Sequence, residues 1–221
     1  EGVESRTGEV QVQDRVVAAV AAPVELVVLQ VEGIALDGRQ RWLGLGDPRG
    51  ALSMARQVIA ESEAQGNRRF EGWTRIYASR YALQCDDVEV ALEEAARATD
   101  ITRITPPARA GALAAMGRAL VRLGAVDQAA EPTREAMTIL HHFGGIEEFE
   151  ALVRLARLEQ LEAAGQRARA HELALESSER LHALAAAIDE PRHRRSFLSR
   201  VPDNVALLER ARRREPTRRS V

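Results

Sequence analysis

Paired carboxylates and histidines are the side chains of this sequence that could bind a metal ion or move a proton. The pair Asp86–Asp87 would suit a site for a metal and a diphosphate, but such a motif needs a third acid where Val90 stands. The pair His171–Glu172 lacks the second histidine, one helical turn later, that a zinc-protease helix requires, because that position is Leu175. We interpret the aspartate pair as a turn and a helix cap, and the histidine as a solvated side chain.

Other catalytic and cofactor-binding patterns are incomplete as well. The glycines in residues 44–50 have neither a preceding strand nor a lysine, so they do not form a phosphate-binding loop. His141 and His142 are adjacent and therefore point to different faces of a helix. Cys85 is the only cysteine and has no partnered base. The sequence thus predicts a chain without catalytic residues, without a metal and without a cofactor.

The composition favours closely packed helices and makes nucleic acid or a membrane an unfavourable partner. Hydrophobic residues make up 45% of the chain but aromatic residues only 4%, so the core must consist mainly of Ala, Leu and Val. All 31 basic residues are arginines, and the net charge of −2 gives no overall attraction to nucleic acid. The longest apolar stretch, residues 16–31, contains Pro23 and Glu25 and is too short to span a bilayer.

The cellular context expected for this chain is a larger cytoplasmic protein. A single cysteine excludes an intrachain disulfide, which is typical of a reducing compartment. The first residue is Glu1 and no signal peptide follows it, so we expect the chain to be a piece of a longer protein.

The elements that must position any site are helical hairpins, and residues 113–136 show the pattern best. Apolar side chains from Leu113 to Leu123 recur at three- and four-residue steps, which places them on one helical stripe. Gly124 supplies the left-handed conformation that commonly ends a helix, and Asp127 is expected to cap the next one. Such a hairpin cannot bury its apolar face alone, so it needs neighbours of the same shape.

The rest of the chain repeats this hairpin in a regular register. The turn positions are Gly46, Asp86, Gly124 and Gly165. An alanine follows each of them by five residues, at Ala51, Ala91, Ala129 and Ala170. Both series step by 40, 38 and 41 residues, which indicates a helical repeat.

We therefore predict an all-α fold, an α-solenoid of about four antiparallel helical hairpins with a C-terminal capping helix. Residues 1–22 are a lead-in, 23–190 the repeat array, and 191–221 the capping helices and an arginine-rich tail. Pro132 disagrees with this scheme, so its helix must start late or bend. The predicted helices of the array are 28–45, 49–64, 69–84, 88–102, 107–123, 128–143, 147–164 and 167–188.

A turn glycine followed five residues later by an alanine is the central feature of tetratricopeptide repeats, which this array resembles. Ser79 and Gly117 match the small residue at which the two helices of such a repeat cross. The period here exceeds the usual 34 residues of that family. Longer arrays of this kind resemble those that follow serine/threonine kinase or signalling-ATPase modules in bacterial proteins, and residues 195–204 resemble the close of such arrays.

This resemblance implies a concave side lined by the first helix of each hairpin, where a partner would bind. The candidate binding residues on those first helices are Gln40, Trp73, Arg80, Arg118, Arg122 and Glu159. Three of the arginines are expected to converge on one extended acidic ligand. The alternative interpretation, which stays open, is that Trp73 and Leu83 belong to the core and the arginines are solvated.

The predicted function is a non-enzymatic scaffold that binds a protein, a peptide or other domains of its parent chain. The alternative is a sensor module that encloses a small effector within the superhelix. A homo-oligomer formed through the N-terminal segment is a further possibility that the sequence leaves open.

Overall fold

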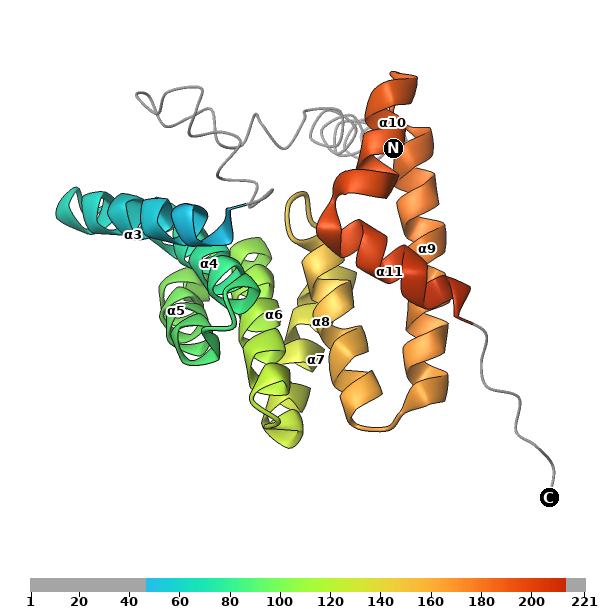
Figure 1. Ribbon diagram of the computed structural model, residues 1–221, viewed down its shortest axis with the longest axis horizontal. Helices are drawn as coiled ribbons and strands as arrows, with labels where there is room; N and C mark the ends of the chain where they lie inside the picture. The colour runs from blue at the N-terminus through green and yellow to red at the C-terminus, as the bar shows by residue number, and fades with distance from the viewer. Residues whose placement is uncertain (1–46, 214–221) are drawn as a thin grey trace, which may run out of the picture. The chain divides into compact units, whose positions relative to one another are not determined.

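The computed structural model describes residues 47–213, and every regular element in that range is a helix. The all-α prediction is therefore confirmed for this part of the chain (Figure 1). The predicted helix 28–45, the lead-in 1–22 and the end of the tail lie outside the described residues. The elements are α3 (Pro48–Ala64), α4 (Arg68–Gln84), α5 (Val88–Ile101), η2 (Thr102–Ile104), α6 (Pro106–Arg122), α7 (Val126–His142), α8 (Glu150–Ala163), α9 (Arg167–Ala186), α10 (Pro191–Arg200) and α11 (Pro202–Arg212).

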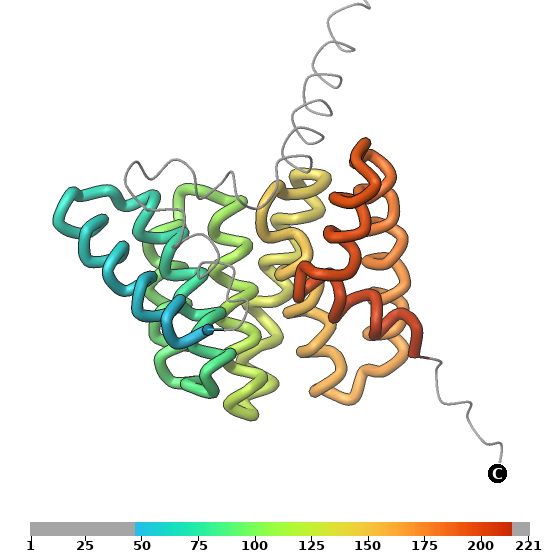
Figure 2. The backbone as a smooth tube through the Cα atoms, turned by 45° about the horizontal axis from the view of Figure 1, so that its top comes forward, coloured from blue at the N-terminus to red at the C-terminus, as the bar shows by residue number. Residues whose placement is uncertain are grey.

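The chain divides into two compact units, and within the described range these are residues 47–170 and 171–213. In the first unit each helix from α3 to α8 packs against the next one, as the tube in Figure 2 shows. Helix α6 also packs against both α4 and α8, so the first helices of three successive hairpins are neighbours. In the second unit α10 packs against α11.

Three of the four predicted turn residues adopt a left-handed backbone conformation, and the fourth, Gly46, lies outside the described residues. Gly124 and Gly165 have φ of 77° and 72°, and Asp86 adopts φ of 60° in the equivalent place. After each of these residues the next backbone N–H donates to a carbonyl five residues earlier, as from Ala125 to Leu120 at 2.9 Å. This bond closes the helix end and satisfies a carbonyl that the helix itself leaves free.

The repeated alanines are buried where the helices pack. The exposed fractions of Ala91 and Ala129 are both 0%. Beside Ala129, a Cβ placed on Gly117 of α6 would lie 2.3 Å from Thr133 Cγ2 of α7. The two helices therefore approach so closely that their crossing tolerates only small side chains, which accounts for Gly117 and Ala129 at this place.

Two local predictions about α7 are corrected. Asp127 does not cap this helix, because the N-cap residue is Ala125. Asp127 lies within the first turn, where its negative charge interacts favourably with the positive end of the helix dipole. The helix also does not start late, since it begins at Val126 and continues through Pro132. Asp87 does occupy the N-cap position of α5, but its side chain makes no capping hydrogen bond.

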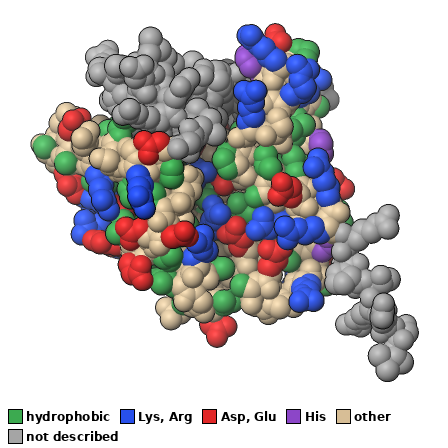
Figure 3. All heavy atoms as spheres, in the orientation of Figure 1, with side chains coloured by type: hydrophobic (Ala, Val, Ile, Leu, Met, Phe, Trp, Pro, Cys, Tyr) green, Lys and Arg blue, Asp and Glu red, His purple; other side chains and the backbone are tan. Residues whose placement is uncertain are grey.

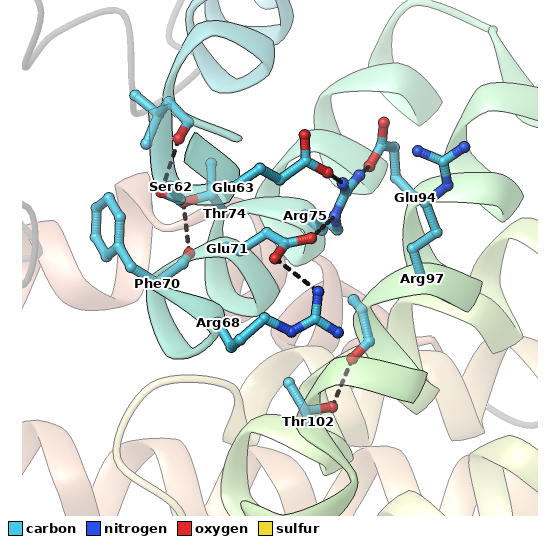
Figure 4. Close-up of polar contacts among 12 residues, drawn as sticks. Ser62, Glu63, Arg68, Phe70, Glu71, Thr74, Arg75, Glu94, Arg97 and Thr102 are labelled. Carbon is cyan, nitrogen blue, oxygen red and sulfur yellow. Dashed lines mark hydrogen bonds and ion pairs between the residues drawn. The ribbon is translucent and has the colours of Figure 1, made fainter. Parts of the chain in front are cut away.

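A buried arginine joins three helices of the first unit (Figure 4). Arg75 of α4 is 2% exposed, and its guanidinium donates to Glu71 at 2.9 Å, to Glu94 of α5 at 2.6 Å and to Glu63 of α3 at 2.5 Å. Burial alone would lower the pKa of Arg75, but the hydrogen bonds to Glu71 and Glu94 raise it instead. The group is thus permanently charged and fully paired, which gives it a structural role.

The repeat register explains why the next hairpin lacks an equivalent of Arg75 and its ion pairs. Adding the 38-residue step places Leu113 where Arg75 stands and Pro132 where Glu94 stands. The arginine and one of its carboxylate partners are therefore replaced together, so no unpaired buried charge is left behind.

Candidate functional site on the first helices

The predicted binding residues that fall within the described range come from three neighbouring helices. Gln40 lies outside that range. The others are Trp73 and Arg80 on α4, Arg118 and Arg122 on α6, and Glu159 on α8.

Two of the predicted arginines are bound by acids of the chain itself. The Arg118 guanidinium donates from Nε and Nη2 to the two oxygens of Glu159, at 2.8 and 3.2 Å. The Arg122 guanidinium pairs with Asp86 of the preceding turn at 2.5 Å. An external ligand would have to compete with these carboxylates, and the exposed Arg122 pair would yield more easily than the two-bond Arg118 pair.

Aromatic side chains form one contact chain along α4. Trp73, Tyr77 and Tyr81 recur every four residues, so they lie on one stripe of the helix. The rings of Tyr77 and Tyr81 stack with their centroids 6.2 Å apart. Phe149, which precedes α8, packs its ring 5.9 Å from Trp73 and 5.8 Å from Tyr77. Leu83 is buried in the adjoining core, as the alternative interpretation held.

A glycine of α6 makes room for this cluster. A Cβ on Gly111 would lie 2.5 Å from Phe149 Cδ2, so the phenyl ring rests directly on the α6 backbone. The residues before α8, predicted to be helical from 147, instead form turns up to Phe149, and α8 begins only at Glu150. This non-helical segment carries Phe149 and its neighbour Glu148 towards α4.

Glu148 is the acid of this cluster. Its Oε1 accepts a hydrogen bond from the Tyr77 hydroxyl, which joins the second hairpin to the fourth. Burial raises the pKa of the Glu148 carboxyl to about 7, although Tyr77 and Arg80 act in the opposite direction. Burial, together with the negative charge of Glu148, also raises the pKa of Tyr77. The carboxyl therefore titrates near neutral pH.

The same cluster holds buried polar atoms that have no hydrogen-bond partner in the described part of the chain. These atoms are Trp73 Nε1, Tyr81 Oη and Glu148 Oε2. Two guanidinium groups lie over the rings, that of Arg69 5.7 Å from the Trp73 centroid and that of Arg80 5.5 Å from the Tyr77 centroid. Buried polar groups are normally satisfied, so this concentration of unpartnered polar atoms marks the place as a candidate binding site.

Sequence reasoning found Trp73 and Arg80 but missed the residues that surround them. The repeat register places Glu148 at the position equivalent to Arg69, and nothing in that register indicates a contact between the second and fourth hairpins. A usable signal was the row of small residues in α6, from Ala108 through Gly111 to Ala115. Such a row leaves space through which side chains of the flanking hairpins can meet.

Several other kinds of site receive no support within residues 47–213. No group of three or more His, Cys, Asp or Glu side chains there could hold a metal ion. None of the helices there combines the length and apolar character needed to cross a membrane. Comparison with models of known protein families, with curated proteins and with solved structures gives no match.

Proposed function

We propose that this chain is a non-enzymatic interaction scaffold, a tetratricopeptide-like helical array that binds a protein or peptide across α4, α6 and α8. The observation that carries this proposal is that these three helices come from successive hairpins and pack side by side. Side chains at equivalent positions thereby form one continuous surface, as helical-repeat binding surfaces require. On the face drawn in Figure 3, acidic and arginine side chains are interspersed over the helices of the first unit, residues 47–170.

The proposed setting is a cytoplasmic bacterial signalling protein, in which this array is a regulatory part. That setting rests on the resemblance of residues 195–204 to the close of such arrays. A second candidate function, a sensor of a small effector, is favoured by the buried donors of Trp73 and Tyr81, because enclosed unpaired groups suit a small ligand. Binding to an extended peptide and binding to a small effector place the ligand on the same helix, α4.

A random-peptide display selection tests the scaffold proposal. Peptides selected on the wild-type chain are titrated against the variant Arg80→Ala/Arg118→Ala, which removes two guanidinium groups from the first helices. The matched control is Arg97→Ala/Arg134→Ala, which removes two exposed arginines, each with one acid partner, from the second helices α5 and α7. We expect the first variant to weaken binding about tenfold or more and the control to leave it unchanged. Failure to select any peptide, or equal effects of the two variants, would refute the scaffold proposal.

A further inference from the structure

One stripe of α4 gathers hydrogen-bond donors and carries no acid. Its members, which we call the donor stripe, are Arg69, Trp73, Tyr77, Arg80 and Tyr81. The single acid of α4 is Glu71. Because successive residues of a helix are turned by 100°, Glu71 falls on the side of α4 that faces away from the stripe. Glu71 is already engaged with Arg75 at 2.9 Å. No carboxylate of α4 itself therefore lies on the donor stripe.

The chain supplies a carboxylate to this stripe from a distant segment. Glu148 accepts a hydrogen bond from Tyr77, and its second oxygen is buried without a partner in the described part of the chain. Trp73 Nε1 and Tyr81 Oη, which are also buried, have no acceptor within residues 47–213, and Tyr81 is only 3% exposed. A carboxylate therefore already lies on the stripe, next to two donors that lack an acceptor among the described residues.

We propose that the donor stripe recognises the carboxylates of an acidic peptide segment, and that Glu148 occupies the stripe as an internal competitor. This inference rests on the proposed scaffold function, because it names the partner chemistry of the same surface. A cationic partner fits poorly, since Arg69 and Arg80 already lie over the aromatic rings and would repel it.

Fewer hydrogen bonds hold Glu148 than hold Glu159. Glu159 meets Arg118 through two charge-assisted hydrogen bonds, whereas Glu148 meets a neutral hydroxyl through one. Two charged groups face Glu148. Arg80 of α4 favours the ionised form of Glu148, whereas Glu147, the preceding residue, disfavours this ionised form. The desolvation of Glu148 is thus only partly compensated, so a ligand carboxylate that reaches more donors can displace it.

Fluorescence anisotropy with labelled hexaglutamate tests this inference. Glu148→Ala removes the competitor and should tighten binding by about tenfold, which corresponds to one hydrogen bond to a charged group. Glu147→Ala is the matched control, because it removes the same charge from the exposed neighbouring position. We expect its affinity to stay within about twofold of the wild type, since screened surface charges act weakly. In the Glu148→Ala background, Tyr77→Phe should reverse the gain.

A second variant keeps the test valid should Glu148→Ala lose its fold, which thermal melting would reveal. Glu148→Gln retains the size of the side chain but not its charge, so it should give a smaller gain. Equal affinities of the Glu148 and Glu147 variants would overturn the inference, as would equal binding of hexalysine and hexaglutamate. Peptides that bind the first helices without an acidic bias would overturn it while leaving the scaffold function standing.

Discussion

The phenyl ring of Phe149 lies against the backbone of α6 at Gly111, where a Cβ would come within 2.5 Å of Cδ2. This contact lets a residue of the fourth hairpin reach Trp73 and Tyr77 of the second. The small residue of the middle hairpin thus decides which side chains of its neighbours meet.

Gly111→Ala is therefore expected to destabilise the chain, although Ala is the better helix former. Helix propensity alone would favour the variant by about 1 kcal/mol. Overpacking against the Phe149 ring should outweigh this gain and leave a net loss of about 1–2 kcal/mol. Chemical denaturation gives the sign directly, and a more stable variant would show that the ring is not held against α6.

The crossing alanines give a second test of the packing. Ala91→Leu and Ala129→Leu should each cost about 1–3 kcal/mol in free energy of unfolding, because both side chains are fully buried. Ala96→Leu, on the exposed side of α5, should change this free energy by less than about 0.5 kcal/mol. Thermal melting of the three variants compares them, and equal losses at all three sites would contradict the repeat register.

The ion pairs of Arg75 predict a loss of stability that a second substitution partly reverses. Arg75→Leu leaves Glu94 partly buried without its partner and should destabilise the chain by about 3 kcal/mol or more. Adding Glu94→Ala removes one of the carboxylates that lost Arg75 and should recover part of the loss, as the paired change to Leu113 and Pro132 in the next hairpin suggests. A double-mutant cycle from urea denaturation measures the recovery, and strictly additive losses would argue against an interaction between Arg75 and Glu94.

Glu148 should make stability depend on pH in a definite direction. Its folded-state pKa of about 7 exceeds the ordinary value of 4.5, so the folded chain binds this proton more tightly than the unfolded chain. The contribution is fully present below about pH 4.5 and is lost as pH rises through about 7, amounting to at most about 3 kcal/mol.

Glu148→Gln mimics the protonated carboxyl and should flatten this part of the profile. Between about pH 5 and pH 8, the wild type should lose free energy of unfolding relative to the Gln variant. Glu147→Gln, at the exposed neighbour, should keep the wild-type slope. Parallel profiles of wild type and Glu148→Gln would mean that the carboxyl titrates in the folded chain as it does in the unfolded one.

The helices and turns could be predicted because local signals determine them. The left-handed positions at Asp86, Gly124 and Gly165, each followed by a buried alanine, fix where each hairpin turns. The predicted start of α8 was wrong by three residues, because contacts with α4 and α6 hold Glu148 and Phe149 outside the helix. Those contacts depend on how hairpins stack, which spacing along one helix does not encode.

The candidate site was only partly predictable for the same reason. Equivalent positions on first helices identified Arg80 and Arg118, but not that Glu159 already holds Arg118. A carboxylate 41 residues away in sequence becomes a partner only after α6 and α8 pack together. Register therefore locates a surface, while tertiary packing decides which of its charges remain available to a partner.

The indole N–H signal of Trp73 offers the most direct measurement of the central claim that the α4 face binds a partner. The chain contains two tryptophans, so a 15N-correlated spectrum shows two indole signals, and Trp73→Phe assigns that of Trp73. Titrating hexaglutamate into the Glu148→Ala variant should move the Trp73 signal downfield as its unpaired N–H gains an acceptor. A Trp73 signal that stays fixed while the anisotropy of the peptide reports saturation would place binding elsewhere and contradict the account.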